Sequence, residues 1–159
     1  MSQVLQGTDF SWPCRVYYED TDGQGFLYHS RCLNFFERAR TEWVRSLGVT
    51  QSEWLARQLG FVVSSAELKY HKPAFLDDAL VATVKVLKVG RSRISMMQDL
   101  LKSNDDGVTH SALADQHCQA ASWSHRKIVS GCFTIAFIDL AKQKPVAMPA
   151  EMSKALAAK

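Results

Sequence analysis

The sequence lacks any apolar run of the ~18 residues that a membrane-spanning helix needs. Its N-terminus also lacks the basic region and apolar stretch of a secretory signal. The cysteines show no C-x-x-C spacing, and Cys32 lies on an apolar helical stripe, so we expect buried reduced thiols at Cys14, Cys32, Cys118 and Cys132. These features predict a cytoplasmic protein without a transmembrane segment, disulfides or a metal site.

Strong charge of one sign is also missing. The net charge is +3, and lysine and arginine are scattered, whereas a protein that binds duplex nucleic acid needs a basic stripe. We therefore expect no nucleic-acid partner. A length of 159 residues and a hydrophobic share of 47% fit one domain with a sizeable core. The chain is predicted to form a single domain over residues 1–159.

One long helix is predicted from about Ser30 to Leu47. Apolar residues recur there at spacings of three or four, at Cys32, Phe36, Ala39, Trp43 and Leu47. Gly48 is expected to end this helix. Phe35 and Val44 interrupt the polar face, so other elements should cover much of the helix. A second, short helix is predicted from a capping box at residues 50–53 and ends by Gly60.

The rest of the chain has the alternating pattern of strands. We expect strands at residues 14–18, 61–70, 80–87, 92–101 and 128–138, the first entered through Trp12-Pro13. The breaks at residues 71–73 and 89–91 are short, which favours antiparallel pairing of the strands that they join. One long helix against one antiparallel sheet predicts an α+β fold.

A motif at residues 17–29 carries the most information about function. It places the carboxylate of Asp22 in a turn that contains Gly25 and opens onto the long helix. A helix N-terminus offers free N–H groups and partial positive charge to an oxygen that becomes an anion. A carboxylate beside such donors suits hydrolysis at a carbonyl group. In turns of this kind an Asp more often caps the turn, and that alternative stays open.

Further motifs follow the first in a fixed order. They are Val16-Tyr17-Tyr18-Glu19-Asp20-Thr21-Asp22-x-x-Gly25-x-x-Tyr28-His29, Leu33-x-Phe35-Phe36-Glu37-Arg38-Ala39-Arg40-Thr41-Glu42, Tyr70-x-Lys72-Pro73-Ala74-x-Leu76-Asp77-Asp78, Gly90-Arg91-Ser92 and Lys144-Pro145-x-x-x-Pro149. The set resembles hot-dog-fold acyl-CoA thioesterases of the 4-hydroxybenzoyl-CoA thioesterase superfamily, and within it the Tol-Pal-associated acyl-CoA thioesterase group of bacteria. The resemblance implies a hot-dog fold, in which an antiparallel sheet of about five strands wraps a long central helix.

The resemblance also implies catalytic roles. Asp22 corresponds to the family's catalytic carboxylate, which activates water or attacks the thioester carbonyl. The family's oxyanion donor is a backbone N–H that falls at His29, while the imidazole could orient Asp22, carry a proton or touch the acyl group. Gly25 would let the thioester approach the backbone, or simply serve a tight turn. Asp20 is expected to cap the turn.

For substrate binding, the resemblance places the nucleotide end of coenzyme A near the turn Arg91, Ser92 and Arg93, and we add Lys72 as a phosphate contact. A solvated strand edge is the alternative for these residues. The family also implies a homodimer or homotetramer with sites at the interface, and no cofactor. The sequence leaves open the acyl group and the choice between acyl-CoA and acyl carrier protein. Candidate pocket walls are Phe26, Leu27, Phe61, Met96 and Met97.

One segment departs from the family pattern. About two dozen residues, 104–127, separate the last two long strands and include His110, His117, Cys118, Trp123 and His125. Their spacing matches no common zinc site, so we expect a surface or interface loop. Residues 150–159 are expected to form a short tail. A non-catalytic acyl-binding module on the same fold is the main functional alternative. A hot-dog dehydratase is a second, which the position of Asp22 before the helix disfavours.

Overall fold

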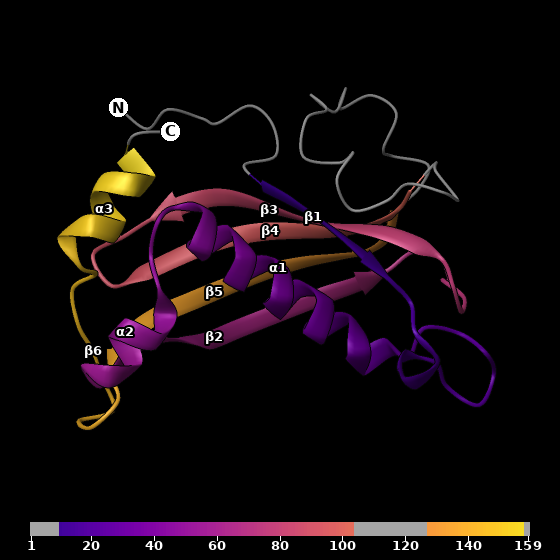
Figure 1. Ribbon diagram of the computed structural model, residues 1–159, viewed down its shortest axis with the longest axis horizontal. Helices are drawn as coiled ribbons and strands as arrows, with labels where there is room; N and C mark the ends of the chain where they lie inside the picture. The colour runs from indigo at the N-terminus through magenta and orange to yellow at the C-terminus, as the bar shows by residue number, and fades with distance from the viewer. Residues whose placement is uncertain (1–9, 104–126, 158–159) are drawn as a thin grey trace.

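The computed structural model describes residues 10–103 and 127–157 (Figure 1). The strands are β1 (Phe10–Arg15), β2 (Leu59–Tyr70), β3 (Ala79–Val89), β4 (Arg93–Lys102), β5 (Lys127–Asp139) and the short β6 (Lys144–Pro145). The α-helices are α1 (Cys32–Ser46), α2 (Gln51–Ala56) and α3 (Ala150–Ala157), and the 3-10 helices are η1 (Tyr18–Asp20) and η2 (His29–Arg31).

The strands form one antiparallel sheet in the order β1-β3-β4-β5-β2, and β6 pairs with β5. Register shifts interrupt the pairing at Val63/Ser65, Val86/Lys88 and Leu100/Leu101, and such irregularities bend and twist a sheet. Helix α1 crosses one face of the sheet along most of its length (Figure 1). The predicted α+β fold, with a long helix wrapped by an antiparallel sheet, is confirmed.

The core lies between α1 and the sheet face that it covers. The predicted stripe is confirmed, because Cys32, Phe36, Ala39 and Trp43 are buried and Leu47 packs against them. Phe35 and Val44 are buried as well, as their place on the opposite side of the helix predicted. The sheet contributes a second layer of buried residues, Leu80, Ala82, Val84, Ile94, Met96, Leu100, Phe133, Ile135 and Phe137. Gly48 has φ +79°, a conformation that favours glycine and stops the helix as predicted.

A buried cation lies in this mostly apolar layer. Arg40 of α1 is 6% exposed, and its Nη1 donates to Oε1 of Gln98 in β4 at 2.7 Å. Its Nη2 pairs with Glu37, and its guanidinium lies 4.7 Å from the centre of the Phe133 ring. The amide of Gln98 donates to the carbonyls of Phe36 and Thr83, so it links α1, β3 and β4. This network fixes the position of α1 on the sheet.

Two predictions near the N-terminus are corrected. The first strand runs from Phe10 to Arg15 and not from residue 14 to 18. Among the described strands it pairs with β3 alone, and an edge strand tolerates Pro13, which has no N–H to donate. The long helix begins with a 3-10 turn at His29–Arg31, so its α-helical part starts two residues later than predicted.

Other corrections concern caps, the tail and one cysteine. No side-chain bond caps α2 at Thr50, so the predicted capping box is absent, and Gly60 lies inside β2. The predicted tail contains helix α3, whose Met152 is wholly buried. Cys14, Cys32 and Cys132 are free, as expected, but Cys132 is exposed because it lies on the sheet face away from α1. Cys118 and residues 104–126 lie outside the described residues.

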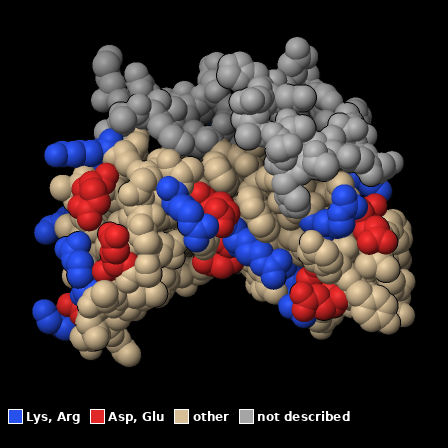
Figure 2. Space-filling model, in the orientation of Figure 1, with Lys and Arg blue, Asp and Glu red and all other residues tan. Residues whose placement is uncertain are grey.

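Strand β2 is the other edge of the sheet. It pairs only with β5 within the described chain, and most of its residues are exposed, including Val62, Val63 and Tyr70. On the described part of the face shown in Figure 2, Lys and Arg are interspersed with Asp and Glu, without a large patch of one sign. None of the helices in the described ranges is long and apolar enough to span a membrane.

Candidate functional site

The site loop, residues 20–28, lies at one end of the sheet, beside the start of η2 (Figure 1). Backbone hydrogen bonds fold it back on itself. The N–H of Asp22 donates to the carbonyl of Phe26 at 2.8 Å, and the N–H of Tyr28 donates to the backbone carbonyl of Asp20 at 2.8 Å. Leu27 inserts its buried side chain and donates its N–H to Ala74 at 2.8 Å. The loop is therefore anchored to the segment that precedes β3.

The carboxylate of Asp22 is held by one of its two oxygens. Oδ1 accepts hydrogen bonds from the N–H groups of Gln24 at 2.8 Å and Phe26 at 3.2 Å, which is the Asx-turn geometry of the structural alternative. Within the described residues, Oδ2 has no hydrogen-bond partner. The turn and a chemical role are thus compatible, because one oxygen orients the group and the other is left for a substrate or water.

Gly25 allows the turn to close. Its φ is +80°, and its N–H donates to the carbonyl of Asp22 at 3.0 Å. A Cβ at this position would meet nothing within 4 Å, so the conformation, and not crowding, is what favours glycine. The tight-turn explanation of Gly25 accounts for its presence without contact to a substrate.

Asp20 is buried behind the loop. It is 1% exposed, and its Oδ2 accepts the N–H of Tyr17 at 3.0 Å, which closes the η1 turn. Its Oδ1 is buried without a partner in the described structure. The contacts of Asp20 are those of a residue that caps the turn, as the sequence predicted.

The start of the long helix supplies backbone N–H groups that can donate to an oxyanion. Tyr28 is extended, with φ −63° and ψ 130°, and its N–H already donates to the backbone carbonyl of Asp20. The next two N–H groups, of His29 and Ser30, have no backbone acceptor in the described part of the chain, because they belong to the first helical turn. They are free to donate to an oxyanion, in keeping with the predicted role of the His29 N–H.

The imidazole of His29 is exposed and lies among aromatic rings. The Tyr28 ring centre is 4.6 Å away and the Tyr70 ring centre 6.4 Å away, both edge-to-face. The hydroxyl of Tyr70 donates to the carbonyl of His29 at 3.0 Å. No hydrogen bond joins His29 to Asp22 in the described structure, so the two side chains are near neighbours in sequence but are not a bonded pair. Sequence reasoning missed Tyr70, although a quoted motif contained it.

Cysteine is an unsuitable nucleophile here. Burial raises the pKa of the Cys32 thiol to about 11 and that of Cys14 to about 12, and the thiol form is a poor nucleophile. Cys132 lies on the far face of the sheet. Of the described groups at this end of the sheet, the Asp22 carboxylate remains the best candidate for attack or for activation of water.

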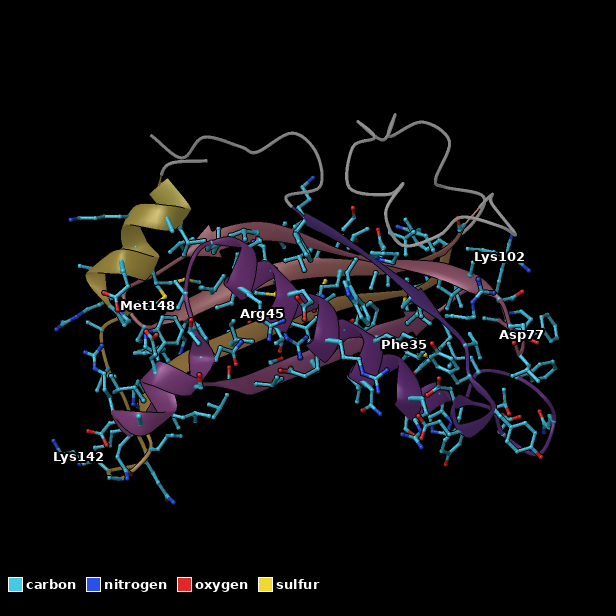
Figure 3. The ribbon with its side chains drawn as sticks, in the orientation of Figure 1. Phe35, Arg45, Asp77, Lys102, Lys142 and Met148 are labelled. Carbon is cyan, nitrogen blue, oxygen red and sulfur yellow. The ribbon has the colours of Figure 1, made fainter. Side chains whose placement is uncertain are left out.

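The predicted binding residues divide between the two ends of the sheet. Lys72 lies two residues beyond Tyr70, the last residue of β2, at the site end of the sheet. Arg91, Ser92 and Arg93 lie at the turn between β3 and β4, roughly 30 Å away along an eleven-residue strand. The Arg91 carbonyl accepts the N–H of Met148, and Figure 3 places Met148 at the end of the sheet opposite Asp77 and Lys102. One protomer does not bring this turn to Asp22.

The candidate pocket walls are also separated. Phe26 is partly exposed and packs edge-to-face on Phe75 at 5.5 Å, beside the site loop. Met96 is wholly buried, and Met97, the next strand residue, points to the other face of the sheet. Phe61 packs near α2 on Trp54. Only Phe26 and Leu27 belong to the loop that carries Asp22.

The described residues contain no group of three or more His, Cys, Asp or Glu side chains that could hold a metal ion. The histidines His110, His117 and His125, for which the sequence raised a zinc alternative, lie outside the described residues.

Known proteins resemble this chain over most of its length. A family model described as the thioesterase-like superfamily matches residues 16–156. An acyl-CoA thioesterase YbgC of Haemophilus influenzae is 38% identical over 147 residues, which cover 92% of this chain and 93% of that protein. Among solved structures, a 1,4-dihydroxy-2-naphthoyl-CoA thioesterase from Synechocystis has a TM-score of 0.76 at 18% identity, with 95% of this chain and 96% of that chain covered.

A Staphylococcus aureus protein solved in complex with CoA has a TM-score of 0.74 at 15% identity, with 94% of this chain and 82% of that chain covered. These two structural likenesses confirm the hot-dog fold. The extent of the family match, together with the similarity to the Haemophilus protein, confirms the resemblance that the ordered motifs predicted. The chain belongs to the thioesterase-like superfamily.

Proposed function

We propose that this protein hydrolyses acyl-CoA thioesters to a free acid and coenzyme A, with Asp22 as base or nucleophile. The observation that carries the proposal is the pairing of a carboxylate that has one unbonded oxygen with a helix start that has two unbonded N–H groups. A carbonyl carbon placed between them is exposed to attack, while its oxygen meets the donors. The activity of the Haemophilus relative, named an acyl-CoA thioesterase, supports the same reaction.

Two routes use this geometry. In one, Oδ2 takes a proton from water as the water oxygen attacks the thioester carbon. In the other, Oδ2 attacks and forms an anhydride, which water then cleaves. Both pass through a tetrahedral oxyanion, and both release the thiolate of coenzyme A. Hydrogen bonds from Gln24 and Phe26 keep the carboxylate in one orientation for either route.

The test is release of free thiol from a panel of acyl-CoA and acyl carrier protein substrates. Asp22→Asn keeps an oxygen that can accept from Gln24 and Phe26, so the turn should survive, while kcat should fall at least ~10²-fold. Asp139→Asn is the matched control, because Asp139 also accepts a backbone N–H, from Lys142 at 2.9 Å, at the remote end of β5. It should keep full activity. Near-normal turnover by folded Asp22→Asn would refute the catalytic assignment.

The same panel tests the alternatives. Turnover of acyl carrier protein substrates in preference to acyl-CoA would change the thiol carrier and leave the chemistry intact. Binding of acyl-CoA without thiol release would favour a non-catalytic acyl-binding module on this fold.

The open edge of β2 supports assembly into a homodimer. This twelve-residue strand pairs on one side only within the described chain, and exposed Val62 and Val63 lie along it. A second copy of the chain could pair its own β2 with this edge and bury Val62 and Val63. Antiparallel pairing about a two-fold axis would reverse the partner's sheet, so that its β3–β4 turn lies toward Asp22. Arg91 and Arg93 of the partner subunit could then meet the phosphates of coenzyme A.

A further inference from the structure

One peptide unit at the site is held at one end and free at the other. The carbonyl of His29 and the N–H of Ser30 belong to the same planar group. The Tyr70 hydroxyl donates to that carbonyl at 3.0 Å, from the last residue of β2. The Ser30 N–H has no backbone acceptor in the described chain. Since a peptide is rigid, a bond that fixes its carbonyl also fixes the direction of its N–H.

We propose that Tyr70 is a positioning residue of the oxyanion hole, which holds the His29–Ser30 peptide so that the Ser30 N–H serves as an oxyanion donor. This inference rests on the proposed thioesterase function. It adds a donor next to the His29 N–H and assigns a task to a strand residue outside the helix. The bond joins residues 41 positions apart and ties the end of β2 to η2.

Two physical effects act through this bond. Orientation is the first, because an oxyanion donor is effective only when it points at the position that the charge will occupy. Polarisation is the second, because a donor on a carbonyl strengthens the N–H at the other end of the same peptide. The hydroxyl is suited to the task. Burial raises the pKa of Tyr70, with a smaller contribution from Cys32, so the group stays a protonated donor at neutral pH.

The ring of Tyr70 has a separate role from its hydroxyl. It lies edge-to-face to the His29 imidazole with ring centres 6.4 Å apart. Tyr70→Phe keeps this contact and removes only the hydroxyl. The variant therefore isolates the bond to the peptide from packing on the side chain.

The experiment compares Tyr70→Phe with Ser64→Ala in the thiol-release assay. Ser64 is a matched control, because its hydroxyl also donates from β2 to a backbone carbonyl at 3.0 Å, that of Thr134, away from the site. For Tyr70→Phe we expect kcat to fall about five- to tenfold, the equivalent of one neutral hydrogen bond, with KM changed less than about twofold. Ser64→Ala should change neither constant. An unchanged kcat in Tyr70→Phe would overturn the proposal.

A second arm separates the peptide from the imidazole. In a His29→Ala background, Tyr70→Phe should lower kcat by the same factor, because the hydroxyl acts through the backbone. Loss of the effect in that background would overturn the proposal and assign Tyr70 to the imidazole.

A third arm does not depend on activity. The amide resonance of Ser30 should shift in Tyr70→Phe and stay in place in Ser64→Ala, and an unmoved Ser30 amide would count against the proposal. If wild type releases no thiol from any substrate, the proposed function fails, while the amide measurement still decides whether Tyr70 holds the peptide.

Discussion

Position 29 carries a side chain and a backbone donor whose contributions can be separated by two substitutions. His29→Ala removes the imidazole and keeps the N–H. His29→Pro removes both. The structure indicates that proline fits, because position 29 is the first of its helix, where a missing N–H breaks no helical bond. Tyr28 is already extended, at φ −63° and ψ 130°, as the residue before a proline should be.

The falls in kcat expected for His29→Ala and His29→Pro differ by the contribution of one oxyanion donor. Loss of a whole oxyanion donor costs about 10²- to 10³-fold in kcat. His29→Ala should show a modest drop, since its imidazole forms no bond to Asp22, whereas His29→Pro should fall a further ~10²-fold or more. Both variants lose the ring contacts with Tyr28 and Tyr70, so these cancel in the comparison.

A matched proline controls for backbone effects. Gln51→Pro places proline at the first position of α2, after Thr50, which is also extended at φ −104° and ψ 112°. It should leave kcat unchanged. The assay is steady-state thiol release, with circular dichroism and sedimentation to confirm folding and assembly. If His29→Ala already falls as far as Asp22→Asn, or if folded His29→Pro matches His29→Ala, the larger role of the backbone donor is refuted.

Two further predictions concern stability and assembly. Gln98→Leu removes the amide oxygen that accepts from Nη1 of the buried Arg40 and leaves the Glu37 pair in place, and it should lower the free energy of unfolding in urea by about 2–4 kcal/mol. Arg40→Met in the same chain should recover part of that loss. If Gln98→Leu alone were as stable as wild type, the hydrogen bond between Arg40 and Gln98 would contribute nothing to stability. The protein should sediment as a dimer or a dimer of dimers, and Arg93→Ala should raise KM for an acyl-CoA but not for the corresponding pantetheine thioester, which lacks the nucleotide. An active monomer, or equal effects on both substrates, would contradict the placement of this turn near the nucleotide.

The sequence by itself determined the main elements of this fold. The stripe on α1 and the alternation on β3 and β4 are visible in local periods, because the core-facing residues of these elements, such as Phe36 and Ala39, Leu80 and Ala82, and Ile94 and Met96, recur at the repeat of a helix or strand. Gly48 and Gly25 were readable for the same local reason, since left-handed φ angles favour glycine. Motif order identified the superfamily, which the family match then confirmed.

Tertiary structure decided the features that depend on contacts between distant residues. Periodicity gave no indication that Arg40 is buried, because its partner Gln98 lies 58 positions away. The link from Tyr70 to His29 spans 41 positions, and the tail folds as α3 because Met152 can reach the core. From the sequence alone, an Asx turn and a catalytic role were alternative explanations of Asp22. Folding allows both, because backbone donors engage one carboxylate oxygen and leave the other free, an arrangement that only three-dimensional geometry specifies.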